Sequence, residues 1–120
     1  MKVTLEEEQI KTIIKKYYSE VEGIEIGVNF SNYEDYQFTV IQASISKKVE
    51  IAGIKAMATE DVDNMKITEI FNYCLPNDYN FKKVTFTSYR VNLPREDYED
   101  HVRAVVEFEP VNQKTKGRHI

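Results

Sequence analysis

The chain is poor in the residues on which most enzyme mechanisms depend. Its 120 residues include two histidines, one cysteine, four glycines and no tryptophan. Histidine and cysteine supply many general bases, nucleophiles and metal ligands, and glycine-rich loops hold phosphates. We therefore predict a protein that is not an enzyme and has no catalytic residues, metal site or cofactor. The alternative is a small enzyme or ligand-binding domain with a pocket between a sheet and its helices.

Signals for disulfides, secretion and membrane insertion are also missing. One cysteine cannot form an internal disulfide, and the sequence contains no charged-then-apolar leader. It also lacks the apolar run of about 18 residues that a membrane-spanning helix requires. These absences favour the cytoplasm and argue against a membrane partner.

Positive charge is scarce in most of the chain. The formal net charge is −4, but the last ten residues hold three basic side chains, Lys114, Lys116 and Arg118, and no acidic one. The first 110 residues therefore carry a net charge of −7. An acidic body repels nucleic-acid phosphates, so we expect no direct nucleic-acid binding and a partner with a basic surface. We assign residues 1–110 to a single α+β domain and residues 111–120 to a basic, disordered tail.

A first helix is indicated between a capping box and a glycine cap. Thr4 and Glu7 have the capping-box spacing, and Gly23 is placed to adopt the left-handed conformation at the far end. The apolar residues between them recur at helical spacing and are expected to face the core: Ile10, Ile13, Ile14, Tyr17, Tyr18 and Val21.

A second helix is expected to begin at a cap supplied by Thr59 or Asp63 and to end before Pro76. Its apolar stripe consists of Ile67, Ile70, Phe71 and Cys74. No basic side chain flanks Cys74 in sequence to lower its pKa, so we interpret it as a core residue and not as a nucleophile.

Alternating polar and apolar residues predict five strands. They cover residues 24–31, 36–46, 49–58, 81–93 and 101–109. The first three, with a turn at residues 32–35 and a break in the alternation at Gly53, are expected to form an antiparallel meander. The predicted fold is α+β, with a mostly antiparallel sheet of about five strands and two helices on one side, in the order α-β-β-β-α-β-β.

The order helix, three strands, helix is also that of double-stranded-RNA-binding domains. Those domains contact RNA phosphates through basic segments near the second helix. Residues 59–63 are Thr-Glu-Asp-Val-Asp, which has the wrong charge, and two further strands follow. RNA binding is therefore disfavoured.

Two acidic segments could hold a metal ion but have simpler explanations. Asp61, Asp63 and Asn64 are similar to the start of an EF-hand loop, yet Lys66 occupies the position of the obligatory glycine. Asp97 and His101 are four residues apart and could bind a divalent cation. Helix capping for the first segment and a solvated loop for the second are the favoured interpretations.

Two loops combine tyrosine with asparagine and aspartate, and a third segment is strongly acidic. Tyrosine offers a large contact area with few rotatable bonds, and Asn and Asp adapt their hydrogen bonds, as in many binding surfaces. The acidic segment would attract a partner rich in lysine and arginine. The residues expected to contact the partner are Tyr33, Glu34, Asp35, Tyr36, Asp78, Tyr79, Glu96, Asp97, Glu99 and Asp100.

The chain resembles small phage and mobile-element proteins of low-GC bacteria in its size, its acidity and its capped N-terminal helix (Thr4, Glu7, Gly23). Its amino-acid composition, rich in Lys, Glu, Ile, Asn and Tyr, is also similar to theirs. Anti-CRISPR inhibitors belong to that group. The resemblance implies a non-enzymatic inhibitor that docks an acidic, tyrosine-bearing surface on a basic nucleic-acid-handling protein such as a CRISPR effector nuclease. It assigns no roles to residues. A structural subunit that completes an oligomer through a strand edge or a helix is a third possibility, and the oligomeric state is left open.

Overall fold

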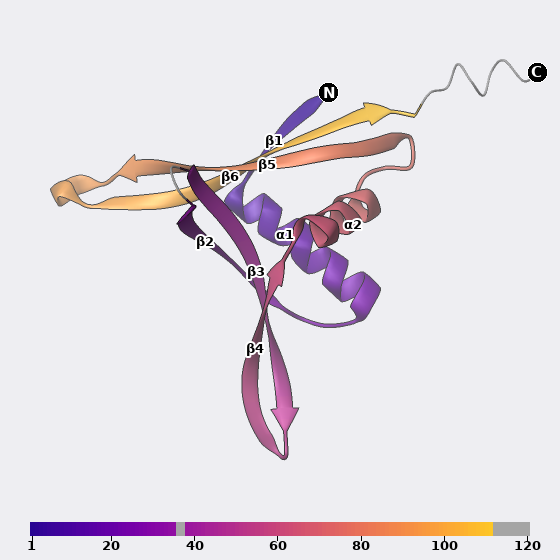
Figure 1. Ribbon diagram of the computed structural model, residues 1–120, viewed down its shortest axis with the longest axis vertical. Coiled ribbons are helices and arrows are strands. Elements are labelled where there is room, and N and C mark those ends of the chain that lie inside the picture. Colours follow the sequence, from indigo (N-terminus) through magenta and orange to yellow (C-terminus); the bar gives the residue numbers. More distant parts are fainter. Residues whose placement is uncertain (36–37, 112–120) are drawn as a thin grey trace, which may run out of the picture.

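The computed structural model describes residues 1–35 and 38–111, with the side chains of residues 33–40 outside the description. The described elements form two antiparallel three-stranded sheets, in the orders β1-β6-β5 and β2-β3-β4, and two α-helices (Figure 1). The α+β class and the β2-β3-β4 meander are confirmed, whereas a single sheet of five strands is wrong. In chain order the main elements are β1 (Lys2–Glu6), α1 (Glu7–Tyr17), β2 (Gly27–Asp35), β3 (Phe38–Ile51), β4 (Ile54–Val62), α2 (Asn64–Cys74), β5 (Tyr79–Asn92) and β6 (Tyr98–Pro110).

Strand β1 occupies residues that were expected to begin the first helix. Thr4 lies in this strand opposite Val105 of β6, and it does not cap α1. The capping box is formed instead by Glu6 and Gln9, whose side-chain Oε1 accepts the Glu6 backbone N–H at 2.9 Å. The prediction failed because Thr4 and Glu7 have a local capping pattern, while β1 depends on pairing with residues about 100 positions away.

The cap at the far end of the first helical segment agrees with the sequence, but Val21, which was expected to face the core, is 47% exposed. Helix α1 continues into a π-helical turn, η1 (Tyr18–Glu22), and Gly23 follows with a φ of +68°. This is the left-handed conformation that glycine adopts without steric cost. At the second helix, Asp63 is the cap, and its Oδ1 accepts the Lys66 backbone N–H at 2.9 Å.

The hairpin of β3 and β4 turns at Ala52 and Gly53, several residues beyond the expected boundary at residues 47–48. Both turn residues have positive φ, +52° and +80°, as a two-residue hairpin turn requires. Gly53, which was interpreted as a break inside a strand, is therefore the turn itself. Strand β3 is longer than predicted and reaches this turn, where Ile51 pairs with Ile54, whereas β4 begins and ends later in the chain than predicted.

The core joins both sheets through the helices. Helix α1 contacts β2 of one sheet and β6 of the other, and α2 contacts β5. The most deeply buried large side chains are Ile10, Ile14, Ile45, Ile70 and Val106. The sheets also meet directly where the Phe30 and Phe86 rings lie 5.8 Å apart.

Two hairpins extend away from this core (Figure 1). Residues 47–58 of β3 and β4 form one, here called the spike, and residues 90–100 of β5 and β6 form the other, here called the tip. The Cα radius of gyration is 17.9 Å, compared with about 14 Å for a compact domain of this length. The chain therefore exposes more strand surface than its core requires.

Candidate protein-binding site

The acidic residues predicted to bind a partner lie at the tip. Glu96, Asp97, Glu99 and Asp100 are all exposed there. Two arginines lie among them in the hairpin, and Arg90 Nε is 3.0 Å from Asp100 Oδ1. The tip therefore carries mixed charge instead of a purely acidic surface.

Asp78 and Tyr79 lie at the opposite end of the same hairpin. Tyr79 pairs with Pro110, whereas the tip begins at the pair of Arg90 and Asp100. A strand rises about 3.3 Å per residue, so some 40 Å separates the two groups. The Tyr79 ring packs edge-on against Phe108 at 5.1 Å, which gives it a role in packing.

The third predicted group is described only in its backbone. Tyr33, Glu34 and Asp35 end β2, and Tyr36 lies outside the described residues. Just before them, Asn32 lines a polar hollow of about 240 Å³ together with Asp100 of β6. The structure thus brings β2 toward the tip but leaves Asp78 and Tyr79 apart from both.

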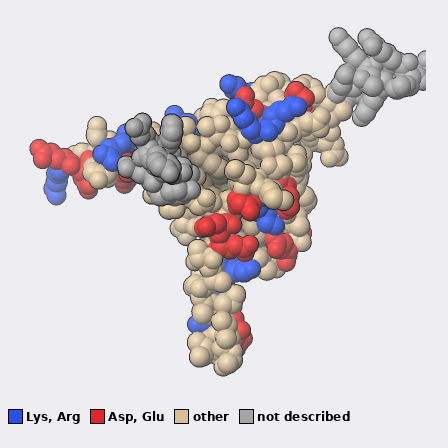
Figure 2. All heavy atoms as spheres, in the orientation of Figure 1, with Lys and Arg blue, Asp and Glu red and all other residues tan. Residues whose placement is uncertain are grey.

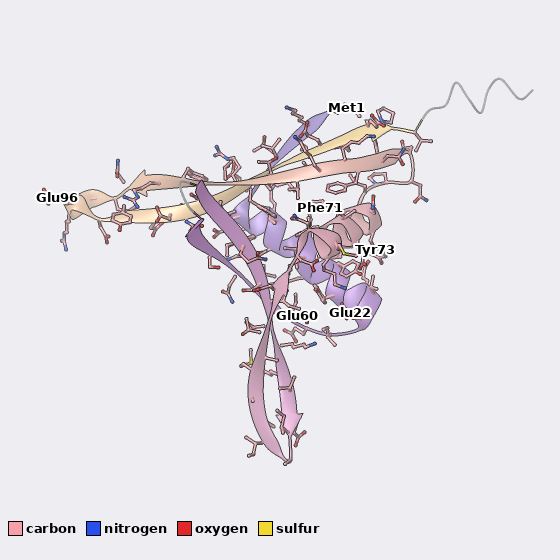
Figure 3. All side chains as sticks on the ribbon, viewed as in Figure 1. Met1, Glu22, Glu60, Phe71, Tyr73 and Glu96 are labelled. Atoms are coloured by element: carbon pink, nitrogen blue, oxygen red, sulfur yellow. The ribbon has the colours of Figure 1, made fainter. Side chains whose placement is uncertain are left out.

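A second acidic surface, not predicted, lies where η1, β4 and α2 meet. Figure 2 shows its carboxylates gathered above the base of the spike, and Figure 3 shows Glu22 and Glu60 on this side of the molecule. Three lysines, Lys16, Lys47 and Lys66, pair with some of these acids at 3.5–3.9 Å. We call this surface the acidic face and define it by Glu20, Glu22, Glu60, Asp63 and Glu69.

Two buried tyrosines, Tyr17 and Tyr18, lie beneath Lys66 at the acidic face. The Tyr17 and Tyr18 rings meet edge to face at 5.4 Å, and Lys66 Nζ lies 5.4 and 5.6 Å from their centroids. Burial raises the pKa of Tyr18, while Lys66 opposes the rise. Burial would lower the pKa of Lys66, but the adjacent tyrosines, followed by the carboxylates, raise it overall. This lysine is therefore held as a cation among the acids.

Tyr73 is the exposed tyrosine of this region. The residue is 47% exposed, and its hydroxyl donates a 2.6 Å hydrogen bond to Glu20 Oε2. This bond raises the pKa of Tyr73, so the phenol stays protonated and the Glu20 carboxylate stays oriented. An aromatic ring held in place by a polar contact is well suited to anchor a partner.

An apolar groove of about 510 Å³ adjoins the acidic face at Glu20 and Tyr73. We call it the helix–strand groove, because β1 forms one wall and the helices form the other. Phe71 lies near it in Figure 3. Its lining residues are Val3, Leu5, Ile13, Lys16, Glu20, Phe71, Tyr73, Cys74, Leu75 and Val106. Small apolar clefts with a polar rim are typical of protein interfaces.

The groove opens beside an unpaired sheet edge. β1 is the outermost strand of the β1-β6-β5 sheet, so its side away from β6 has no strand neighbour among residues 1–35 and 38–111. Val3 and Leu5 contribute their side chains to the groove. A strand added to this edge would place alternate side chains over the groove.

Cys74 lines this groove without the properties of a nucleophile. It is half-buried, and its Sγ lies 3.9 Å from the Ile13 carbonyl oxygen. Burial raises the pKa of its thiol, with Lys16 opposing the change, so the thiolate is disfavoured.

The sequence contained little signal for this site. Its acids are spread from Glu20 to Glu69, and only the packing of η1 against α2 brings them together. The alternation of Val3 and Leu5 could have indicated β1, but it covers only five residues. Tyr73 was not among the predicted partner-binding residues, because its contact with Glu20 depends on tertiary structure.

Two other kinds of feature, a metal centre and a membrane-spanning helix, are absent from the described residues. These residues bring together no group of three or more His, Cys, Asp or Glu side chains that could hold a metal ion. None of their helices is both long and apolar enough to cross a bilayer. No protein-family model, curated protein or solved structure matches the chain.

Proposed function

We propose that this protein is a binding module that holds an extended, basic and partly apolar segment of another polypeptide in the helix–strand groove. The observation that carries the proposal is the position of an apolar groove between the free edge of β1 and a rim that bears Glu20 and Tyr73. The edge supplies backbone hydrogen bonds, and the groove receives alternate apolar side chains.

The acidic face selects the charge of the bound segment. Its five carboxylates outnumber the three lysines that pair with them, so its excess charge is negative. Exposed ion pairs of this kind contribute little to stability, and their carboxylates are available to a partner at small cost. Lysine or arginine beside the apolar anchors would therefore speed association and improve specificity.

A peptide-binding measurement tests this proposal. The probe is a fluorescent peptide of alternating lysine and isoleucine, and its control replaces each lysine with glutamate. We expect anisotropy to show binding of the first peptide, weakened by salt, and much weaker binding of the second. Equal binding of both peptides would contradict the role of the acidic face.

Matched charge reversals locate the site. The double variant Glu20→Lys with Glu22→Lys should weaken peptide binding by about tenfold or more, which corresponds to about 1.4 kcal/mol. The control, Glu96→Lys with Asp97→Lys, makes the same charge change at the tip and should have a smaller effect. The opposite ranking would place the binding surface at the tip, as the sequence alone predicted.

The finer form of this proposal is an inhibitor of a basic nucleic-acid-handling protein, such as a CRISPR effector nuclease. Proteins that bind nucleic acid present dense lysine and arginine clusters, which is the chemistry the acidic face would attract. Adding the purified protein to such a nuclease should reduce cleavage, and the Glu20→Lys, Glu22→Lys variant should restore it. Unchanged cleavage at saturating inhibitor would remove this nuclease from consideration.

A further inference from the structure

The spike has one apolar face and one charged face. Its register places Ile51 opposite Ile54 and Val49 opposite Ala56. Because side chains alternate along a strand, these four residues share a face. Ile51 and Ile54 are 66% and 69% exposed, so no part of the chain that the structure describes covers the apolar face.

The edges of the spike are unpaired among the described residues. The pairing of β2 with β3 ends at Gly27 and Ser46, so β3 has no neighbour on that side beyond Ser46. β4 is the outer strand of its sheet. An isolated two-stranded hairpin is marginally stable, and a free apolar edge readily pairs with another chain.

The spike is also basic, unlike most of the chain. Residues 47–58 contain Lys47, Lys48 and Lys55 with Glu50 as their one acid, a net charge of +2, and Lys47 at the base of the spike pairs with Glu60 of the acidic face at 3.7 Å. The spike is therefore an extended, basic and partly apolar segment. This is the chemistry that the helix–strand groove and the acidic face are proposed to bind.

We propose that the spike of one copy of this chain binds in the helix–strand groove of a second copy. The inference rests on the proposed function and names its partner. Strand β4 of the first copy would extend the sheet of the second copy at the free edge of β1, and Ile54 and Ala56 would enter the groove. Lys55, on the opposite face of β4, would stay in solvent.

The contact joins different surfaces of the two copies. Figure 1 shows the spike directed away from β1, so one chain does not fill its own groove. Each copy offers one spike and one groove, and the contact is therefore head-to-tail. Such contacts build open chains or closed rings, and the smallest ring is a two-fold dimer in which each copy places its spike in the groove of the other.

Complementation of two defective variants tests this contact. The spike variant, Ile51→Asp with Ile54→Asp, has a damaged spike and an intact groove. The groove variant, Val3→Asp with Glu20→Lys, has a damaged groove and an intact spike. The control, Met65→Asp, changes a 77% exposed apolar residue that lies in neither surface.

Light scattering over a range of concentrations gives the readout. We expect the measured molar mass of the wild type and of Met65→Asp to rise above the 14.1 kDa of one chain as the concentration increases. The molar mass of each defective variant alone should stay at 14.1 kDa. An equimolar mixture of the two defective variants should form a complex of two chains and nothing larger. The inference would be overturned by a wild type that remains monomeric, by self-association of the spike variant alone, or by a mixture that remains monomeric.

Folding and function are controlled separately. If a double variant loses its circular dichroism signal, Ile54→Asp alone or Glu20→Lys alone replaces it, since both side chains are at the surface. The lysine–isoleucine peptide separates the two proposals. Peptide binding by a monomeric wild type would refute self-association only, whereas loss of both peptide binding and self-association would refute both.

Discussion

Ala52 and Gly53 show how single positions control the spike. Both have positive φ, and a Cβ added at Gly53 would have no heavy atom within 4 Å. The cost of replacing Gly53 is therefore conformational and not steric. Ala52 already has an unfavourable conformation for a residue with a side chain.

We predict that Gly53→Ala destabilises the spike by about 1 kcal/mol. Amide protons of residues 54–58 should exchange about fivefold faster at low protein concentration, while global unfolding changes little. Ala52→Gly is the matched control and should slow the same exchange or leave it unchanged. Faster exchange in Ala52→Gly would contradict the positive-φ explanation.

The cap of α2 is a second position at which one side chain decides a local structure. The sequence allowed Thr59 or Asp63, and only Asp63 accepts the Lys66 N–H. Thr59 lies in β4 opposite Ser46. We predict that Asp63→Ala lowers the free energy of unfolding by about 1 kcal/mol, measured by urea denaturation. Thr59→Ala should cost less, and an equal or larger loss would argue against this cap.

Strand β1 ends at Glu6, whose side chain adds contacts to the backbone pairing of this strand with β6. Glu6 Oε1 accepts a bond from Arg103 Nε at 2.9 Å, and its Oε2 accepts one from the Tyr89 hydroxyl at 3.0 Å. These contacts join the end of β1 to both other strands of its sheet. The Arg103 and Tyr89 hydrogen bonds hold the pKa of Glu6 below its ordinary value of 4.5.

This pKa shift predicts a dependence on pH. A carboxyl group with a lowered folded-state pKa stabilises the fold above its unfolded-state pKa. The stabilisation is lost as the pH falls below 4.5 and passes through the folded-state value. Wild type should therefore be more stable than Glu6→Gln at pH 7, and urea denaturation should show the two converge in acid. A difference that is constant from neutral to acidic pH would contradict this assignment.

The whole molecule combines a compact core with two exposed hairpins. The core residues of β3 and β4, Ala43, Ile45 and Val62, all lie outside the spike. Ser46 and Thr59 are paired at its base, so a two-residue turn can join them. The spike should therefore be dispensable for folding.

We predict that replacing residues 47–58 with Asn-Gly leaves the domain folded. Such turns suit two-residue hairpins, so the shortened β3–β4 pair should form normally. The radius of gyration from X-ray scattering should fall, and the far-ultraviolet circular dichroism should retain its helical signal. Loss of cooperative thermal unfolding would show that the spike contributes to the core.

Much of the fold could be predicted from local patterns. The apolar stripes of α1 and α2, the cap at Gly23 and the alternation in β5 and β6 are short-range signals, and the structure contains each of them. These elements can be predicted from the sequence because each depends on residues within a few positions of one another. The acidic composition is likewise independent of the fold.

The pairing of β1 with β6 and the assembly of the candidate site depended on tertiary structure. Lys2 pairs with Glu107, and Glu20 bonds Tyr73, across separations that no local period encodes. Composition determined that acids and tyrosines are abundant. Only the packing of the helices against two sheets determined which of them share a surface, because side chains far apart in the chain become neighbours through the burial of a common core.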